Sequence, residues 1–362
     1  MQRTASVEIN LDALTHNLSV VRSHAGNAKI MAVIKANAYG HGMLKIAQHL
    51  QDKVDALAVA CVEEAVVLRK AGINTRIVVL QGFHHADHLQ QCDQYKLEPV
   101  CHQVWQLELL QESTIAQPLK IWLKVDTGMH RLGLSAEEAK QAFLQLQNCD
   151  QVEKTLLMSH FANADEPENI LNQQQLERFN NLLAALSIEP SLESGPESSL
   201  ANSAGIVSIP GAIKDWVRPG IMLYGASPLM NKTAAELGLK SVMRLSSTVI
   251  ALTDVKVGEA IGYGSTWTCE ADSKIAVIAI GYGDGYPRHA QSGTAVAIHG
   301  QRCPLVGRVS MDMICVDISK LDEVVNVSDV VVLWAENPSV DEVAKTASTI
   351  GYELLCHAGK DQ

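Results

Sequence analysis

The 362-residue sequence contains no hydrophobic run of transmembrane length, and its first 25 residues mix charged and polar groups where a signal peptide would carry an apolar core. It also contains no dense cluster of lysine and arginine that would override the net charge of −11, which comes from 29 basic and 40 acidic residues. Nucleic acids and anionic membranes are therefore poor candidate partners. We predict a cytoplasmic globular protein with no nucleic-acid or membrane partner.

Paired cysteines are also lacking. The eight cysteines are scattered and none forms a CxxC pair, so the sequence predicts reduced thiols without a zinc site or a disulfide. His84, His85 and His88 stand close together around Asp87, but nothing nearby supplies a second set of ligands. We interpret these histidines as the solvated start of a helix and predict no metal site.

Strand-like and helix-like segments alternate along the first part of the chain. Apolar runs typical of buried parallel strands occupy residues 30–35, 56–60, 76–80, 97–101, 120–125 and 155–160, with helical patterns between them, and residues 187–199 are predicted to form a longer loop. Such βα units suit a closed (β/α)8 barrel of the TIM type or an open doubly wound sheet. The sequence has no GxGxxG motif after its first strand, which weakens the open, dinucleotide-binding alternative.

The pattern changes near Leu239 to short β-rich runs separated by glycine, proline, aspartate and serine turns. We therefore predict an α/β protein with a (β/α)8 barrel at residues 1–235 and a mainly β domain at residues 236–362. Functional residues of a barrel lie at the C-terminal ends of its strands. Because Lys35, Lys124 and His160 each come at the end of an apolar run, one face of the barrel should collect them.

Lys35 is the most unusual of these residues. An ammonium group at the mouth of a buried strand is costly unless it is paired, neutralised or used covalently, and burial lowers its pKa toward the range of a nucleophile or base. A lysine that merely extends its head to solvent is the ordinary alternative. The surrounding segment AVIKANAYGHG resembles the lysine motif of bacterial alanine racemases, which depend on pyridoxal phosphate (PLP). The resemblance implies that Lys35 binds PLP covalently and that Tyr39 packs beside it.

Two further barrel segments match this family. In KVDTGMHRLG, the resemblance implies that Arg131 holds the substrate carboxylate and that Lys124, often carbamylated in the family, supports it. By itself this charged string would suit a salt-bridged surface loop. In MSHFANADEP, the resemblance implies that His160 joins a hydrogen-bond network beside the cofactor ring, although a lone histidine there is more often a satisfied core residue.

Another pair of barrel segments, ANSAGI and DWVRPGIMLYG, predicts a phosphate site. An Asn-Ser pair before small residues can offer backbone N–H groups and a hydroxyl to a phosphate at a helix start, although this signal is weak alone. The resemblance implies that Ser203, Gly220 and Ile221 bind the phosphate and that Arg218 contacts the pyridine nitrogen. A guanidinium there opposes protonation of the ring, which favours proton exchange over transamination and decarboxylation.

The β domain carries the remaining matches. Tyr263 in AIGYGSTWT would ordinarily be read as a turn residue, but the resemblance implies a catalytic base that reaches the active site of the other subunit of a homodimer. It also implies that Tyr282 lies near the substrate channel, that the N–H of Met311 meets the substrate carboxylate with Asp312 beside it, and that Tyr352 binds phosphate and narrows the pocket. The end of the chain lacks the arginine-containing tail of the family, which bears on the packing of its expected last strand.

Together the matching segments cover nearly the whole chain, and they occur in the same order as in the family. They imply a PLP-dependent isomerase that interconverts L-alanine and D-alanine with Lys35 and Tyr263 as bases on opposite faces, supplying or consuming D-alanine for peptidoglycan. Two alternatives remain: a racemase of broader specificity that acts on serine or other small amino acids, and a PLP carrier or regulator without turnover.

Overall fold

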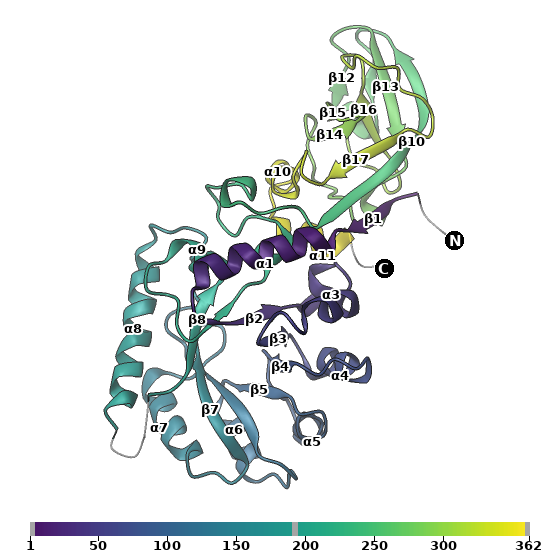
Figure 1. The fold of residues 1–362 in the computed structure, drawn as a ribbon. Coiled ribbons are helices and arrows are strands. Elements are labelled where there is room, and N and C mark those ends of the chain that lie inside the picture. Colours follow the sequence, from purple (N-terminus) through teal and green to yellow (C-terminus); the bar gives the residue numbers. More distant parts are fainter. Residues whose placement is uncertain (1–3, 190–194, 359–362) are drawn as a thin grey trace.

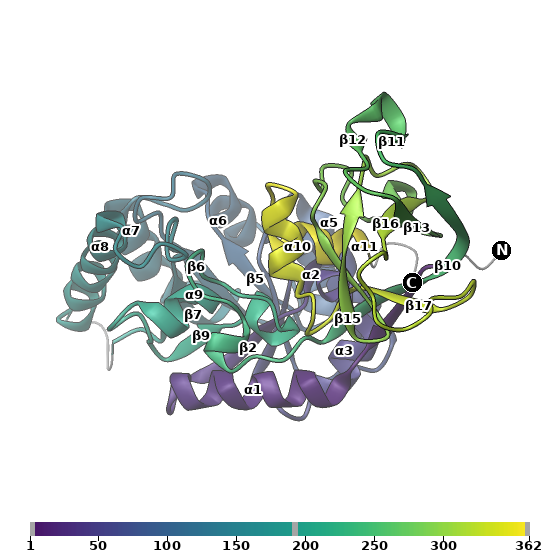
Figure 2. The same ribbon diagram turned by 90° about the horizontal axis from the view of Figure 1, so that it is seen from above.

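The computed structural model describes residues 4–189 and 195–358, which form a parallel barrel and an antiparallel β domain (Figures 1 and 2). Most of the buried apolar side chains of both parts belong to one continuous hydrophobic cluster. Within these residues, no helix combines the length and the apolar composition needed to cross a membrane.

The barrel contains eight parallel strands, each paired with its neighbours, and the pairing of the last strand with the first closes it. Its strands are β2 (Lys29–Val33), β3 (Ala56–Val59), β4 (Arg76–Val79), β5 (Glu98–Cys101), β6 (Leu119–Lys124), β7 (Val152–Met158), β8 (Ser198–Asn202) and β9 (Trp216–Arg218). Most of these strands are rich in apolar residues and are buried, as expected where helices surround the sheet. The predicted (β/α)8 barrel is confirmed.

Helices and short turns connect the strands. They are α1 (Leu11–Ala25), α2 (Lys35–Tyr39), α3 (Met43–Leu50), α4 (Val62–Lys70), α5 (Ala86–Gln94), α6 (Val104–Gln111), α7 (Ala136–Leu146), α8 (Ile170–Ser187), α9 (Ser203–Ser208), η1 (Ile221–Tyr224) and η2 (Ala235–Leu237). The capping residue determines where a helix begins, as α1 and α7 show. Asn10 caps α1 by accepting hydrogen bonds from the N–H groups of Asp12 and Ala13, and Ser135 forms a capping box with Glu138 at α7.

The β domain is a seven-stranded antiparallel sheet, which confirms the predicted mainly β character of this region. Its elements are β1 (Ser6–Ile9), β10 (Met243–Val255), β13 (Ser273–Ile278), β14 (Ala295–Ile298), β15 (Gln301–Val306), β16 (Ile314–Asp317) and β17 (Val330–Trp334), with the small pair β11 (Ala260–Ile261) and β12 (Trp267–Thr268), the turns η3 (Tyr263–Ser265) and η4 (Tyr282–Asp284), and the helices α10 (Val340–Thr346) and α11 (Gly351–Ala358). The N-terminal strand β1 pairs with β10, so both ends of the barrel sequence are tied to this domain.

Two local expectations are wrong. The predicted loop over residues 187–199 is wrong at its end, because Ser198 already begins β8; residues 190–194 lie outside the described residues. The expected last strand is wrong, because Tyr352 lies on α11, which packs beside α2 at the junction of the two parts (Figure 2). Residues 359–362 also lie outside the described residues. The division at 235/236 stays a prediction.

Candidate active site

A cavity of about 520 Å³ opens at the C-terminal ends of the barrel strands. This volume is in the range of small-molecule sites. Ten of the residues predicted from the sequence line it, namely Lys35, Tyr39, Lys124, Arg131, His160, Ser203, Arg218, Gly220, Ile221 and Tyr352. The expectation that one face of the barrel would collect Lys35, Lys124 and His160 is therefore met.

Lys35 leaves the barrel at a strained turn. Strand β2 ends at Val33, and the residues from Ala36 to Tyr39 have φ angles of +52° to +54°, which place four consecutive non-glycine residues in the left-handed region. Each such residue costs roughly 1–2 kcal/mol. Part of this cost is offset by His41, whose buried ring donates from Nδ1 to the carbonyl oxygens of Ala38 and Tyr39 at 3.0 and 2.9 Å. The turn is therefore held in place by its surroundings.

The two cavity lysines experience an unfavourable environment for positive charge. Burial, followed by the charge of Arg131, lowers the pKa of Lys35 from its usual 10.5. Burial, followed by the charges of Arg218, Arg131 and Lys35, lowers the pKa of Lys124 to about 8. Both amines are consequently easier to deprotonate than a surface lysine.

Arg218 is the buried centre of the hydrogen-bond network. Its Nη1 donates to Ser199 Oγ at 2.6 Å, while Nη2 donates to the carbonyl oxygens of Ser159 and Leu200 and lies 3.3 Å from His160 Nδ1. Burial lowers the pKa of Arg218 to about 10, so the guanidinium remains charged at neutral pH. Burial and the charge of Arg218 lower the pKa of His160 well below its usual value, and the neutral ring can accept from Arg218 at Nδ1.

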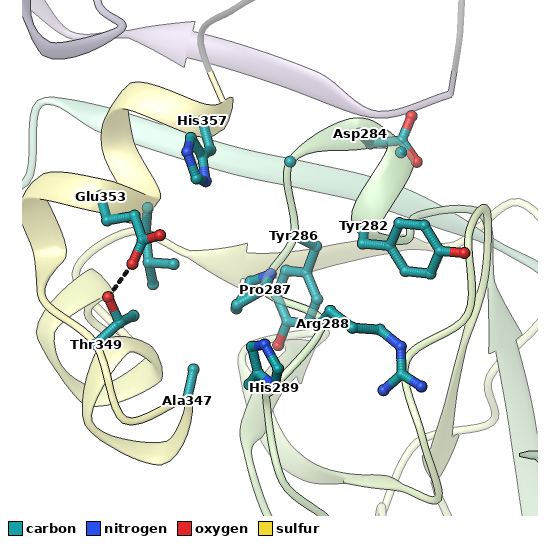
Figure 3. A pocket seen from close by; sticks show the side chains of 13 residues that line it. Tyr282, Asp284, Tyr286, Pro287, Arg288, His289, Ala347, Thr349, Glu353 and His357 are labelled. Atoms are coloured by element: carbon teal, nitrogen blue, oxygen red, sulfur yellow. Dashed lines mark hydrogen bonds between the residues drawn. The ribbon is translucent and has the colours of Figure 1, made fainter.

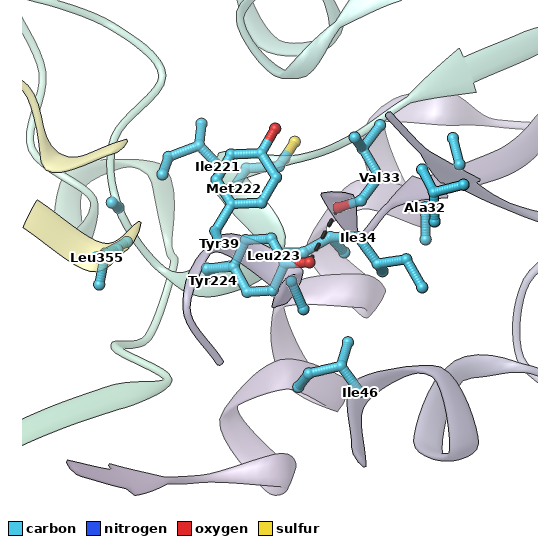
Figure 4. Packing of buried hydrophobic residues seen from close by; sticks show 14 of the residues in the cluster. Ala32, Val33, Ile34, Tyr39, Ile46, Ile221, Met222, Leu223, Tyr224 and Leu355 are labelled. Atoms are coloured by element: carbon cyan, nitrogen blue, oxygen red, sulfur yellow. Dashed lines mark hydrogen bonds between the residues drawn. The ribbon is translucent and has the colours of Figure 1, made fainter. Parts of the chain in front are cut away.

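Tyr39 and Tyr352 line the cavity, and Tyr39 packs against both Tyr352 and the buried Tyr224. The ring centroid of Tyr39 lies 4.8 Å from that of Tyr224 and 6.0 Å from that of Tyr352. The hydroxyl of Tyr224 donates to the carbonyl oxygen of Val33 at 2.9 Å, which connects these tyrosines to β2 (Figure 4). A Cβ atom at Gly220 would lie 2.5 Å from the Tyr39 hydroxyl, so only glycine allows this close approach.

These residues fit PLP. Lys35 offers an amine to an aldehyde, and four cationic side chains but no Asp or Glu are among the described residues that line the cavity, which suits a phosphate group and a carboxylate. Ser203 begins α9 after the capping residue Asn202, and its hydroxyl accepts a hydrogen bond from the N–H of Gly220 at 2.8 Å. This contact joins the two loops for which phosphate binding is predicted.

Comparison with known proteins decides the family. The models of the N-terminal and C-terminal domains of alanine racemase match residues 9–228 and 242–362. The alanine racemase of Thioalkalivibrio sulfidiphilus is 48% identical, with 99% of this chain and 98% of the relative covered. The crystal structure of the biosynthetic alanine racemase of Pseudomonas aeruginosa superposes with a TM-score of 0.93 at 43% identity, covering 99% of this chain and 97% of the other. The structure of the alanine racemase of Acinetobacter baumannii superposes with a TM-score of 0.91 at 40% identity, covering 98% of this chain and 97% of the other.

The chain belongs to the alanine racemase family. The resemblance inferred from separate motifs is thereby confirmed over nearly the full length. The gap between the two family models, residues 229–241, contains the predicted domain division.

Four residues predicted for the racemase site lie outside the barrel cavity, on the β domain. The exposed fractions of Tyr263 and Met311 are 70% and 55%, and Asp312 is also exposed. Tyr282 lines a second cavity of about 550 Å³, between the loop at η4 and helix α11 (Figure 3). Their predicted roles stay predictions, and that of Tyr263 depends on a second subunit.

Sequence reasoning missed several residues of the barrel site. Gln81, Ala60 and Cys356 also line the cavity. Gln81 follows the apolar run of β4 as Lys35 follows that of β2, so the same strand-end rule could have found it. The position of Cys356, one helical turn after Tyr352 on α11, depended on recognising a helix where a strand was expected.

Proposed function

We propose that this chain interconverts L-alanine and D-alanine with PLP held on Lys35. The observation that carries the proposal is a lysine whose pKa is lowered by burial, in a cavity whose other charged lining residues are all cationic among the described residues. Membership of the alanine racemase family supports the substrate. Ser203, Gly220, Ile221 and Tyr352 are the residues proposed to hold the phosphate end, and Tyr39 is proposed to pack beside Lys35.

Bound PLP supplies an electron-withdrawing ring that acidifies the α-proton of an attached amino acid. The protein must bind the substrate carboxylate and limit side reactions. Arg131 is proposed to hold the carboxylate with its planar fork, supported by Lys124. Arg218, charged and bonded to neutral partners, is proposed to face the pyridine nitrogen and to oppose a second positive charge there. Proton exchange at Cα is then favoured over transamination and decarboxylation.

Two bases on opposite faces of the substrate are proposed to move the proton. Lys35 Nζ serves one face, and its lowered pKa increases the share of neutral amine that can accept a proton. Tyr263 Oη serves the other face. Because Tyr263 is exposed on the β domain and does not line the cavity of its own barrel, we propose that it enters the site of a partner subunit in a homodimer. Three other residues of the β domain are proposed to complete that site. The N–H of Met311 would meet the substrate carboxylate with Asp312 beside it, and Tyr282 would lie near the substrate channel.

The deciding experiment measures D-alanine formed from L-alanine by purified protein with PLP, beside a Lys35→Ala control. We expect turnover that is lost in the control. Deuterium incorporation at Cα of alanine and of serine, measured in heavy water, separates the alternatives. Exchange that is as fast with serine would indicate a broader racemase, and no exchange by protein that has bound PLP would indicate a carrier and overturn the proposal.

A further inference from the structure

Glu64 lies on the first turn of α4 and bonds to two backbone groups of the barrel cavity. Its Oε1 accepts a hydrogen bond from the N–H of Ala36 at 2.9 Å, and its Oε2 accepts one from the N–H of Ala60 at 2.7 Å. Ala36 and Ala60 both line the cavity. The Glu64 carboxylate therefore links two parts of the cavity wall, although Glu64 itself does not line the cavity.

The two bonded groups occupy key points of the backbone. Ala36 directly follows Lys35 and is the first of the four left-handed residues, while Ala60 directly follows β3. Strands β2 and β3 are parallel neighbours, and the N–H of Ile34 donates to the carbonyl oxygen of Ala58 at 2.8 Å just before they diverge. Beyond this bond, Glu64 connects the backbone segments that follow the two strands.

Helix capping explains only one of these bonds. Glu64 is the third residue of α4, where a glutamate often bonds back to the start of its helix, and the side chain of the capping residue Cys61 makes no capping bond. The bond to Ala60 serves this purpose. The bond to Ala36 does not, because Ala36 belongs to a different segment, 28 residues earlier.

We propose that Glu64 is a positioning residue for the racemase reaction: by fixing the peptide group that follows Lys35, it sets the direction in which the Lys35 amine enters the cavity. The inference rests on the proposed function. The negative charge of Glu64 also raises the pKa of Lys35, against the larger effects of burial and Arg131. The hydrogen bond of Glu64 thus affects the position of the Lys35 amine, and its charge affects the pKa of the same amine.

The test compares Glu64→Gln with Glu63→Gln. Glutamine keeps the size of Glu64 but has one acceptor atom, and its amide N–H group would face one of the two backbone N–H donors. Glu63 is an exposed neighbour on the same helical turn that pairs with His88 at 3.2 Å, so its variant removes the same charge from the same helix start. Apoprotein of each variant is mixed with PLP, and the visible absorbance of the lysine-bound cofactor is followed over time.

For Glu64→Gln we expect the rate of cofactor bonding and kcat to fall by about tenfold or more, as small misplacements of reacting groups do. The KM for alanine should stay within about twofold, because Arg131 is untouched. Glu63→Gln should match the wild type in both rates, and the losses in Glu64→Gln should persist at temperatures where this variant is fully folded. Glu64→Asp, which is too short to reach both donors, should lie between Glu64→Gln and the wild type.

Other outcomes overturn the inference. Wild-type rates in Glu64→Gln would show that the bond to Ala36 does not position Lys35. Equal losses in the two glutamine variants, or losses that follow the thermal midpoint, would show a helix-capping role only. If Glu64→Gln fails to fold, Glu64→Asp decides by the same criteria. A wild type that does not bond PLP at all would instead count against the proposed function.

Discussion

At the scale of single residues, Lys124 shows how neighbouring charges prepare an amine for reaction. Its pKa of about 8 leaves roughly a tenth of the amine neutral near pH 7, and only the neutral amine reacts with carbon dioxide. The resulting carbamate would place a negative charge among Arg131, Arg218 and Lys35. We predict that bicarbonate raises kcat, and that a carbamate signal appears in carbon NMR with isotope-labelled bicarbonate.

The signal should strengthen as the pH rises from about 7 to 9, since the neutral fraction of Lys124 grows over this range. Lys124→Ala should lose both the signal and the bicarbonate effect. Lys120, which lies on the same strand and pairs with Glu153, offers a matched control, and Lys120→Ala should keep both. A bicarbonate effect that survives in Lys124→Ala would contradict the prediction.

His41 makes folding sensitive to acid. Burial lowers its pKa to about 4 from the usual 6.5. Between these values the unfolded chain binds a proton that the folded chain does not, so the free energy of unfolding decreases as the pH falls, by up to about 3 kcal/mol from this residue. The contribution is complete above pH 6.5 and is lost toward pH 4. Denaturant unfolding at a series of pH values measures it.

The variant His41→Asn isolates this effect, because an asparagine amide can still donate to Ala38 and Tyr39 but does not titrate. Its free energy of unfolding should depend less steeply on pH between about 6.5 and 4. The exposed His24 is the matched control, and His24→Asn should keep the wild-type slope. An unchanged slope in His41→Asn would show that another group causes the acid sensitivity.

At the scale of elements, Gly40 connects the lysine turn to α11. Its φ is +80°, and an added Cβ would lie 2.1 Å from the carbonyl oxygen of Leu355 on that helix. Gly42 has a similar φ of +87° but only a side-chain atom of Lys45 at 4.0 Å. We predict that Gly42→Ala costs roughly 1–2 kcal/mol through backbone strain, and that Gly40→Ala costs at least about twice that, because α11 must also shift.

Chemical denaturation measures both costs. Since α11 carries Tyr352 into the cavity, Gly40→Ala should in addition weaken PLP binding, whereas Gly42→Ala should do so less. Equal destabilisation by the two substitutions would contradict the prediction, because it would show that α11 moves away from the added methyl group at no cost in stability.

The sequence predicted the elements whose side chains follow a clear period. Apolar runs located the first six barrel strands. Strand β8 escaped detection because its buried Ser198 and Ser199 resemble loop residues. Their hydroxyls bond within the barrel, and that of Ser199 accepts from Arg218, so these serines serve the buried guanidinium.

The sequence predicted site residues only where they belong to a family motif. Family motifs identified ten cavity residues. They gave no sign that Ala36 to Tyr39 are left-handed, since the segment has no glycine and its conformation depends on tertiary partners such as His41. The role of Glu64 was hidden for a similar reason, because a glutamate in the first turn of a helix is ordinary in sequence and its bond to Ala36 exists only in the fold.

At the scale of the whole molecule, we predict that two inactive variants complement each other. Lys35→Ala lacks one of the two proposed bases and Tyr263→Phe lacks the other. In a mixed dimer, the barrel of the Tyr263→Phe chain keeps its Lys35 and receives Tyr263 from its partner, so one of the two sites should be active. Racemisation should therefore appear after the subunits are mixed and exchanged.

The concentration dependence of this rescue checks the explanation, because rescue requires mixed dimers to form. Each variant incubated alone at the same total concentration is the control. No rescue, with mixed dimers demonstrated by differently tagged subunits, would contradict sites built from two chains.

The pairing of β1 with β10 also has a consequence for how the chain is made. Ser6 pairs with Ser246, about 240 residues later, so β1 leaves the ribosome long before its partner exists. At about 5–20 residues per second, the delay is roughly 12 to 50 seconds. During this time the barrel strands can assemble behind an N-terminal strand whose ladder is unpaired, which is a form prone to association with other chains. Newborn chains of this protein would gain most from a chaperone that covers their first ten or so residues.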